Sequence, residues 1–477
     1  MSPRERGTGG RVVVFLVLLA LVTGGVALER RTPGVTGVRA AETGVDGPVV
    51  PQADTVSTAW YCAAGTAGAG GTADETVYVA NLSPRDLSAV VTVQPGGDDA
   101  SRSHEIEVGP YERVGVRVGD VLEAASPGVM VEVMGGLAIV EHQLRGANDV
   151  AMGPCAQQPS RTWYFASGGT PRGALQSLEL YNPFGDDAVI DVTFLTEGGV
   201  QEPQALQGFV VGRRSKVSVP VHDLVPRQER VATLVRVRSG RIVAEQLRVL
   251  DGTDGRSGLA MTAGVPVPRT RWTIPSGTAA AGTSGGLAIA NFGLAPAEVE
   301  VSLLLSGDGV LAPETVDIPS RSVVVVDPSI RVPAGTAYVI VVQAQGDTPV
   351  VAEAFVTERV GTAEARGAAE TTGVVAPARR WALAGSPPRA SAAVLAVNRA
   401  TKPVTVEVRA YTAGDPDSPR SAPAMAIPPG KVARFDLDEW GIDPDQVIVV
   451  SADGPIVVGR EVFVGARSLS LGVPFGP

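Results

Sequence analysis

The chain of 477 residues contains few cysteines, histidines or aromatic residues. With two cysteines and three histidines it can build neither a disulfide-rich scaffold nor a four-cysteine zinc site. Aromatic residues make up 5% of the chain, and the formal net charge is −10. Because nucleic-acid binding depends on clustered basic side chains, we do not expect this acidic chain to bind DNA or RNA.

Long helical patterns are missing as well. The 57 glycines and 37 prolines make up about a fifth of the chain, well above the usual share of about 12%. Beyond the N-terminal segment, no stretch of about 12 residues shows clear helical periodicity. This composition excludes coiled coils and helix bundles and favours a β-rich protein.

One long apolar run lies near the N-terminus. Three arginines precede the uncharged segment Val12–Leu28, which is slightly shorter than a hydrocarbon core of roughly 30 Å. We predict that residues 1–28 form a signal anchor, so that 12–28 crosses the cell membrane once with the N-terminus inside. The alternative is a signal peptide cleaved after small residues, which would release a secreted protein. Both interpretations export the rest of the chain.

Four landmarks recur in the same order four times: a tryptophan, an asparagine, a basic residue at a turn and a glutamate in a late strand. They are Trp60, Asn81, Arg113 and Glu141; Trp163, Asn182, Lys216 and Glu245; Trp272, Asn291, Arg321 and Glu353; and Trp381, Asn398, Lys431 and Glu461. This spacing predicts a structural repeat of about 105 residues.

Each repeat contains about seven short, valine-rich runs of alternating apolar and polar residues, separated by turn residues. This size and spacing are typical of an immunoglobulin-like β-sandwich. We therefore predict an all-β chain of four tandem sandwich repeats after a flexible linker at 29–57. The predicted repeats are 58–158, 159–267, 268–376 and 377–477. A β-propeller is the alternative, but it needs a four-stranded unit of about 40–50 residues, and the repeat is not divided in this way.

The four glutamates share strand faces with apolar residues; Glu353, for example, shares its face with Val351 and Phe355. A carboxylate on such a face must be paired, protonated or at an edge. We expect each to pair with the basic residue of its own repeat and so fix the strand register. A repeated ligand-binding carboxylate is the alternative. No second acid recurs beside them, so general acid–base catalysis is not expected.

The asparagines and tryptophans are expected to have structural roles. An asparagine before a turn bonds to nearby backbone and tolerates left-handed geometry. The four tryptophans are expected to seal the edge of each sandwich or its joint with a neighbour, with a platform for stacking on sugars as the alternative. Trp440 lies outside the repeated positions and is the best candidate for an exposed aromatic residue.

Cys62 and Cys155 lie at opposite ends of the first repeat and have no counterparts in the other three. In an exported domain this placement predicts a disulfide, with two buried free thiols as the alternative. The histidines do not recur in register, and no H-x-x-x-H or G-x-S-x-G spacing is present. We therefore expect no metal, no cofactor and no catalytic residue.

The segments WYFASGG (163–169), YNPF (181–184) and PVVAEAF (349–355) resemble a repeat of exported bacterial surface proteins. From about residue 58 onward the chain resembles an uncharacterised exported or membrane-anchored family of GC-rich Gram-positive bacteria built from such repeats. The fourth copy departs from the pattern, with WALAGS at its start and Arg399 after the asparagine. The resemblance implies an extracytoplasmic location and no known activity.

These observations predict a non-enzymatic structural or interaction protein of the bacterial cell envelope. The four repeats are expected to form an end-to-end rod that presents loops to a cell-wall polymer or an envelope protein. The alternative is a module that binds cell-wall glycan and assists envelope polysaccharide assembly. An enzyme would need one non-repeating cluster of acids or histidines in a cleft, and the sequence offers no nucleus for it.

Overall fold

A computed structural model describes residues 47–476, except 69, 97–98, 148, 254–255, 281–282 and 361–363. Val45–Pro477 form one compact unit. The predicted anchor Val12–Leu28 and residues 29–46 of the predicted linker lie outside the described residues. Among those that are described, no helix has the length and apolar character needed to cross a membrane.

The first predicted repeat folds into two four-stranded antiparallel sheets, ordered β1-β6-β3-β4 and β5-β2-β7-β8. All seven strands predicted from the sequence are present, and β8 is an eighth that the pattern did not reveal. The elements are β1 (Thr58–Cys62), β2 (Asp74–Asn81), β3 (Leu87–Gln94), β4 (Arg102–Val108), β5 (Arg113–Arg117), α2 (Val118–Val121), β6 (Gly128–Met134), β7 (Ala138–Arg145) and β8 (Val150–Pro154).

The second and third repeats have the same strand order, with β12-β11-β15-β9 and β14-β10-β16-β17 in one and β18-β23-β20-β21 and β22-β19-β24-β25 in the other. The second contains β9 (Thr162–Phe165), β10 (Ala174–Asn182), β11 (Ala188–Thr196), β12 (Gly199–Gln201), η1 (Gln204–Leu206), β13 (Gln207–Val211), β14 (Ser215–Pro220), α3 (Val221–Leu224), β15 (Val231–Ser239), β16 (Val243–Asp251) and β17 (Arg256–Ala263). The third contains β18 (Arg271–Thr278), β19 (Thr283–Asn291), β20 (Ala297–Leu305), β21 (Glu314–Ile318), β22 (Ser322–Val326), η2 (Pro328–Arg331), β23 (Ala337–Gln345), β24 (Val351–Val360) and β25 (Glu364–Thr372).

In the fourth repeat the long strand β32 joins the strands into one nine-stranded sheet. Its first part pairs with β26 and β28, and its second part pairs with β27 and β33. The elements are β26 (Ala378–Leu383), β27 (Ser391–Asn398), β28 (Val404–Thr412), β29 (Asp415–Ser421), β30 (Met425–Ile427), β31 (Val432–Asp436), η3 (Leu437–Trp440), β32 (Val447–Val464), β33 (Ala466–Leu471) and β34 (Val473–Pro474).

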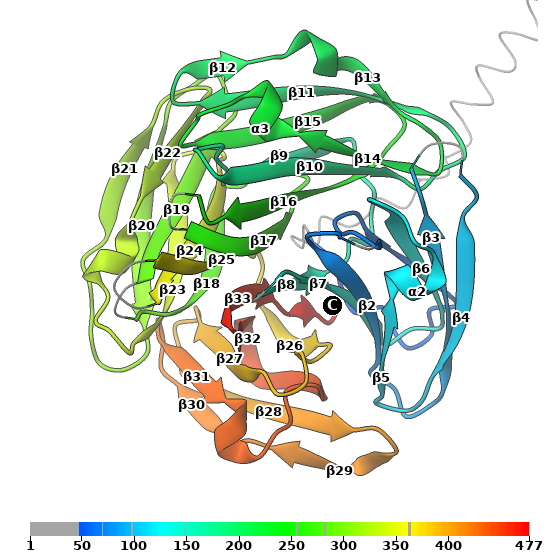
Figure 1. The fold of residues 1–477 in the computed structure, drawn as a ribbon. Helices are drawn as coiled ribbons and strands as arrows, with labels where there is room; N and C mark the ends of the chain where they lie inside the picture. Colours follow the sequence, from blue (N-terminus) through cyan, green and yellow to red (C-terminus); the bar gives the residue numbers. More distant parts are fainter. Residues whose placement is uncertain are drawn as a thin grey trace, which may run out of the picture. The chain divides into compact units, whose positions relative to one another are not determined.

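The strands β8, β17, β25 and β33, one from the C-terminal part of each repeat, lie next to one another in Figure 1. A short parallel pairing of β17 with β25 joins sheets of the second and third repeats. Among the described strands, no sheet closes into a barrel or a propeller. The all-β sandwich fold is therefore confirmed, and the propeller alternative is not.

The predicted end-to-end rod is wrong, because the first and fourth repeats pack against each other. The core around Trp60 includes Ala382, Val447 and Val473 of the fourth repeat. Two ends that share a core cannot be the two ends of a rod. Because Val45–Pro477 form a single compact unit, the four repeat boundaries stay a prediction.

The described end of the predicted linker also packs against these two repeats. Val50 is buried and forms a bridge with Phe475, and Leu137 donates its N–H to the carbonyl of Pro51. Val50 and Pro51 thus connect the end of the predicted linker to both the fourth and the first repeat.

The predicted disulfide between Cys62 and Cys155 is confirmed, with 4.8 Å between their Cα atoms. It lies beside a bridge between Tyr61 and Ala156 that joins the beginning and the end of the first repeat. The second repeat has an equivalent bridge between Tyr164 and Val265. The positions of the two cysteines are taken there by Phe165 and Gly264.

Phe165 packs where Gly264 lacks a side chain, since a Cβ on Gly264 would lie 2.7 Å from Cζ of Phe165. Ile274 with Gly373 and Leu383 with Gly472 repeat this arrangement. A large apolar side chain over a glycine therefore joins the ends of three repeats where a covalent bond joins those of the first.

We expect unreduced protein, unfolded in denaturant, to contain no free thiol. Replacing both cysteines by alanine should lower the free energy of unfolding by about 2–5 kcal/mol, because the unfolded chain loses a long closed loop. Thiol titration and urea unfolding measure the two effects. Two titratable thiols, or unchanged stability in the double variant, would contradict this assignment.

Candidate functional site

Each repeated asparagine closes a turn through the same set of hydrogen bonds. Asn81 accepts from the N–H of Ser83 at 2.8 Å and donates through Nδ2 to the carbonyls of Arg85 and Val108. Equivalent bonds are made by Asn182, Asn291 and Asn398. Hydrogen bonds to nearby backbone, as expected for an asparagine before a turn, are thus present in all four repeats.

The four repeated tryptophans are buried. Nε1 of Trp163, Trp272 and Trp381 donates to the carbonyls of Ile242, Val350 and Ile456, which lie a few residues before the glutamate of the same repeat. Trp60 instead donates to the hydroxyl of Thr58. Since their rings are covered, these four do not form a platform for sugars.

Trp440, by contrast, is 38% exposed at the end of η3, as expected. A short helical turn occurs at this place in every repeat, as α2, α3, η2 and η3.

The four repeated glutamates are all buried and bind the backbone of the preceding repeat. Glu245 Oε2 accepts from the N–H groups of Ala63 and Ala64, at 2.9 and 2.6 Å. Glu353 Oε2 accepts from the N–H of Ser167 at 2.7 Å. In both cases the donor follows the tryptophan of the previous repeat by three or four residues.

The first repeat makes the same contact with the fourth. Glu141 Oε1 accepts from the N–H of Ala384, the third residue after Trp381, at 3.0 Å. The contact that joins successive repeats therefore also joins the fourth repeat to the first.

In the contact between the third and fourth repeats, both the backbone donor and the glutamate lie at shifted positions along their strands. Pro275 stands three residues after Trp272, where Ala63 and Ala384 donate in the other repeats, and proline has no N–H. The donor is instead Thr278, whose N–H and hydroxyl both bond to Glu461 at 2.9 Å.

Glu461 is displaced to match. It lies opposite Ala393, five residues before Asn398, whereas the other three glutamates lie opposite a residue three before their asparagine. A shift of two residues keeps a side chain on the same strand face, so the contact survives.

The expected pairing of each glutamate with the basic residue of its own repeat is wrong. Arg113 and Lys216 lie in strands opposite the residue before the asparagine, but Arg321 and Lys431 precede their strands and lie in turns. The four positions are therefore not equivalent: Val323 and Val432 take the places of Arg113 and Lys216, and Arg321 and Lys431 stand two residues and one residue before them.

The basic residues nevertheless also bind the preceding repeat. Lys216 donates to Ser126 at 2.5 Å, and Arg113 donates to the carbonyl of Ser386 in the fourth repeat at 2.8 Å. Lys431 donates to the carbonyl of Gly307 and Arg321 pairs with Glu202.

Two of the glutamates pair with arginines that were not among the candidates from the sequence. Glu141 pairs with the buried Arg460 at 2.7 Å, and Glu461 pairs with Arg434 and Arg467 at 2.8 and 3.1 Å. Arg460 also donates to the hydroxyl of Ser470 and to the carbonyl of Gly385. Arg460 lies 319 residues from Glu141 in another repeat, so sequence spacing gives no sign of this pair.

Glu353 has no such partner within salt-bridge distance among the described residues. Burial raises its pKa from the ordinary value of 4.5 to about 8, although the N–H of Ser167 and the more distant Arg248 act in the opposite direction. This glutamate is therefore largely protonated at neutral pH. Nearby, Glu370 forms an ion pair with Arg248 and accepts a hydrogen bond from the hydroxyl of Thr262 at 3.0 Å.

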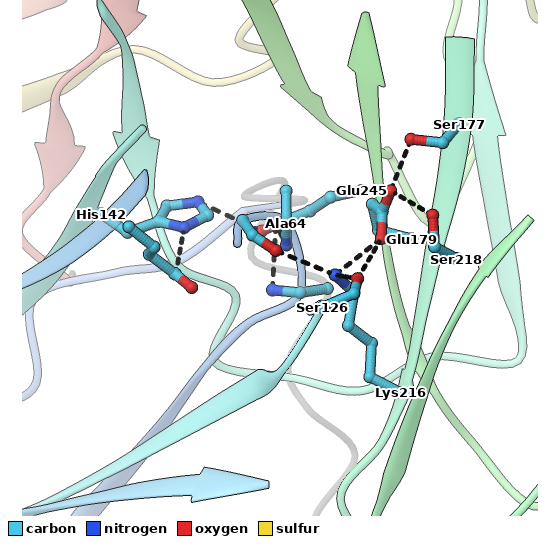
Figure 2. A network of polar contacts seen from close by, with 11 residues as sticks. Ala64, Ser126, His142, Ser177, Glu179, Lys216, Ser218 and Glu245 are labelled. Carbon is cyan, nitrogen blue, oxygen red and sulfur yellow. Dashed lines mark hydrogen bonds and ion pairs between the residues drawn. The ribbon is translucent and has the colours of Figure 1, made fainter. Parts of the chain in front are cut away.

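Figure 2 shows two polar groups where the first and second repeats meet. In one, Lys216 pairs with Glu179 at 2.7 Å, and Glu179 also accepts from Ser177 and Ser218. All of these polar atoms are satisfied, as a buried pair requires.

In the other group His142 lies between two buried carboxylates. Its Nδ1 is 2.9 Å from Glu75 Oε1, and its Nε2 is 3.6 Å from Glu245 Oε1. Burial lowers the pKa of His142, but Glu245 and Glu75 outweigh this effect and raise it above its ordinary value. Glu75, which lies six residues before Asn81, was not a candidate from the sequence. Gln176 holds the same place before Asn182 and bonds to Gln246.

A metal centre is not supported by the oxidised chain. Ligand atoms of Cys62, His142 and Cys155 lie within 4.8 Å of one another, but the two sulfurs are joined in the disulfide. A disulfide sulfur is a poor metal ligand, since metals bind the thiolate.

A pocket of about 320 Å³ lies among strands β8, β17, β25 and β33. All four repeats line it, through Pro154 of the first, Trp163 and Glu245 of the second, Trp272 and Glu370 of the third, and Trp381 of the fourth. The described residues Gly47 and Pro48 also contribute. This is a concave site of the size at which small ligands begin to be held, roughly 300 Å³.

The raised pKa of Glu353 predicts how stability depends on pH. Between about pH 4.5 and 8 the folded chain keeps a proton that the unfolded chain has released, so this group makes folding less favourable as pH rises. In Glu353→Gln, which cannot titrate and still accepts from Ser167, we expect a smaller loss of stability over that range. Urea unfolding at a series of pH values measures it; parallel curves for the variant and the natural chain would refute the assignment.

The buried pair of Arg460 and Glu141 should be needed for stability. We expect Arg460→Leu to lower the free energy of unfolding by about 3–5 kcal/mol, because Glu141 stays buried without its cation. Arg409→Leu, which breaks an exposed pair with Glu407 in the same repeat, is the control and should cost at most about 1 kcal/mol. Equal effects of the two substitutions in urea unfolding would contradict this role of Arg460.

Similarity to solved structures is weak. The Thermotoga maritima protein 1070 is 20% identical over 22% of this chain and 93% of its own, with a TM-score of 0.20. A tetra-tandem repeat from the extending region of a large adhesion protein is 10% identical over 88% of this chain and 99% of its own, with a TM-score of 0.10. Scores this low carry no argument about fold or function. No curated protein sequence matches the chain.

A family profile does match, over residues 143–421. The matched segment covers more than half of the chain and extends from the end of the first repeat into the fourth. The chain belongs to DUF5719, a family of unknown function.

Proposed function

We propose that this protein is a non-enzymatic interaction protein of the bacterial cell envelope, held outside the cytoplasm by residues 12–28 and binding a wall polymer or an envelope protein. The proposed location comes from the N-terminal sequence and from the resemblance to exported surface proteins of GC-rich Gram-positive bacteria. Release by signal cleavage is the alternative for the anchor.

One observation supports a binding role over catalysis. The residues that recur four times, which were the best candidates for chemistry, are committed to turns, cores and contacts between repeats. A carboxylate that already accepts backbone N–H groups in the interior is poorly placed to move protons for a substrate. The recurring residues therefore serve to build one body on which loops are presented.

The alternative is recognition of cell-wall glycan. Of the five tryptophans that could stack on a sugar, four are buried. Trp440 is the exception, since its partly exposed ring offers an apolar surface next to the acidic side chains of Asp438 and Glu439. Such a ring suits stacking on a pyranose, which makes Trp440 the residue that distinguishes the two functions.

The test is capture of purified residues 45–477 by isolated cell-wall sacculi, with and without the attached polysaccharide, and crosslinking in the intact envelope. We expect saturable capture by both preparations or a crosslink to a defined envelope protein. Capture that disappears with the polysaccharide, and with Trp440→Ala but not with Ile330→Ala, would favour the glycan function. Ile330 is the control because it is exposed on η2, the corresponding helical turn of the third repeat. The absence of both capture and a crosslink would refute the proposal.

A further inference from the structure

A second cavity, of about 410 Å³, lies where the second and third repeats meet. Glycines and alanines of the second repeat line it from one side, and Ala288, Val323, Val325 and Phe355 of the third repeat line it from the other. It shares no described lining residue with the pocket of about 320 Å³. Its volume falls within the range of small-molecule sites, roughly 300–1,000 Å³.

A comparison of the repeats explains why this junction leaves room. The strand partner of the repeated glutamate is Glu179 in the second repeat and Ala288 in the third. Lys216, which pairs with Glu179 at 2.7 Å, corresponds in strand register to Val323. The ion pair that lies between the first and second repeats is thus replaced by two small apolar side chains between the second and third.

The first and fourth repeats also have larger side chains at the position three residues before the asparagine. Tyr78 stands there in the first repeat, with the guanidinium of Arg113 3.5 Å above the centre of its ring. Leu395 stands there in the fourth. The third repeat has the smallest side chain of the four at this position, which leaves space that a side chain takes up in the others.

The second repeat contributes a basic side chain to the wall of this cavity, that of Arg230. It lies five residues before the strand partner of Trp163, just as Ser126 lies five residues before that of Trp60. The hydroxyl of Ser126 is 3.5 Å from a carboxylate oxygen of Glu179. Arg230 therefore holds the place of a residue that contacts a carboxylate at the preceding junction.

Arg230 is the basic group of the wall that is available to a ligand. Its side chain is half-buried and, within the described part of the chain, makes no hydrogen bond or ion pair. Glu197 lies near it but accepts the backbone N–H groups of Glu229 and Arg230, at 2.7 and 3.1 Å. The other described basic residue of the wall, Arg248, pairs with Glu370.

The acidic residues near the cavity oppose an anion only weakly. Glu229 lines the wall but is exposed, so solvent ions screen its charge. Glu353 lies on the same strand face as Phe355, and burial raises its pKa to about 8, so it is largely uncharged at neutral pH. The rest of the described wall is mainly apolar, which favours an apolar body on the ligand.

We propose that this cavity binds a small carboxylate with an apolar body, whose carboxylate pairs with Arg230 while its body lies against Ala288, Val323 and Val325. Guanidinium and carboxylate form strong, charge-assisted hydrogen bonds. The ligand brings to this junction the carboxylate that Glu179 brings to the preceding one. The inference concerns the junction of two repeats and holds whether or not the protein binds an envelope partner.

The test compares three ligands with the same apolar body, 3-phenylpropionate, 3-phenylpropan-1-ol and 3-phenylpropylamine, by isothermal titration of residues 45–477. We expect the carboxylate to bind and the alcohol to bind at least about tenfold more weakly, because a hydrogen bond to a charged group is worth at least one decade in affinity. The amine, whose charge Arg230 repels, should bind no better than the alcohol.

Three variants locate the site. Ala288→Glu combined with Val323→Lys installs the pair of the preceding junction, fills the cavity and should abolish binding. Arg230→Ser installs the residue found at the corresponding place of the first repeat, and it should remove the preference for carboxylate over alcohol. Arg236→Ser is the matched control, since this exposed arginine of the same repeat is not among the described lining residues, and it should bind as the natural chain does.

Circular dichroism establishes that each variant is folded. If the double variant does not fold, Val325→Phe fills the cavity from a half-buried position and should also abolish binding. The ligand comparison and Arg230→Ser need neither of these variants. Equal affinity for carboxylate and alcohol, absence of carboxylate binding, unchanged binding in a folded variant that fills the cavity, or equal effects of Arg230→Ser and Arg236→Ser would overturn the proposal.

Discussion

The structure depends on a buried carboxylate that accepts backbone N–H groups from the preceding repeat. Glu245 and Glu353 each reach the segment that follows the tryptophan of the repeat before, and Glu141 reaches the fourth repeat in the same way. A carboxylate removed from water must recover its lost hydrogen bonds, and charge-assisted bonds from backbone N–H groups are among the strongest replacements. Burial of each such glutamate is therefore favourable only when the adjacent repeat is in place to donate these N–H groups. Assembly of the repeats is thus part of folding.

The surroundings of each glutamate differ, although its backbone contact is the same. Glu141 and Glu461 are neutralised by arginines, Glu245 lies near His142, and Glu353 keeps its proton because no cation is close. The contact is also robust to a change in the backbone. Where Pro275 removes the usual donor, Thr278 and Glu461 are both displaced along their strands and meet again. The same meeting of repeats creates the pocket of about 320 Å³, which residues of all four repeats line.

Much of the fold and part of the candidate site could be predicted from local patterns. The alternation of apolar residues gave the sandwich strands, and the position of Asn81 and its counterparts before turns gave their hydrogen bonds. The predicted partner of the glutamates was wrong because similar-looking turn sequences differ in register, so that Arg321 and Lys431 lie in turns while Lys216 lies in a strand. Arg460, His142 and Glu75 were not linked to one another or to the glutamates, since they meet across strands far apart in the chain.

The sequence by itself determined the all-β architecture, the recurrence of the unit, the structural asparagines, the disulfide and the family of unknown function to which the chain belongs. These features depend on residue periodicity, turn chemistry and spacing, which are properties of neighbouring residues. Only the tertiary structure decided that the first and fourth repeats meet, that the glutamates act between repeats, and that residues of all four repeats line one pocket. These features depend on strand register and on contacts between distant segments, and a chain of similar repeats has the same local pattern whether it extends or closes on itself.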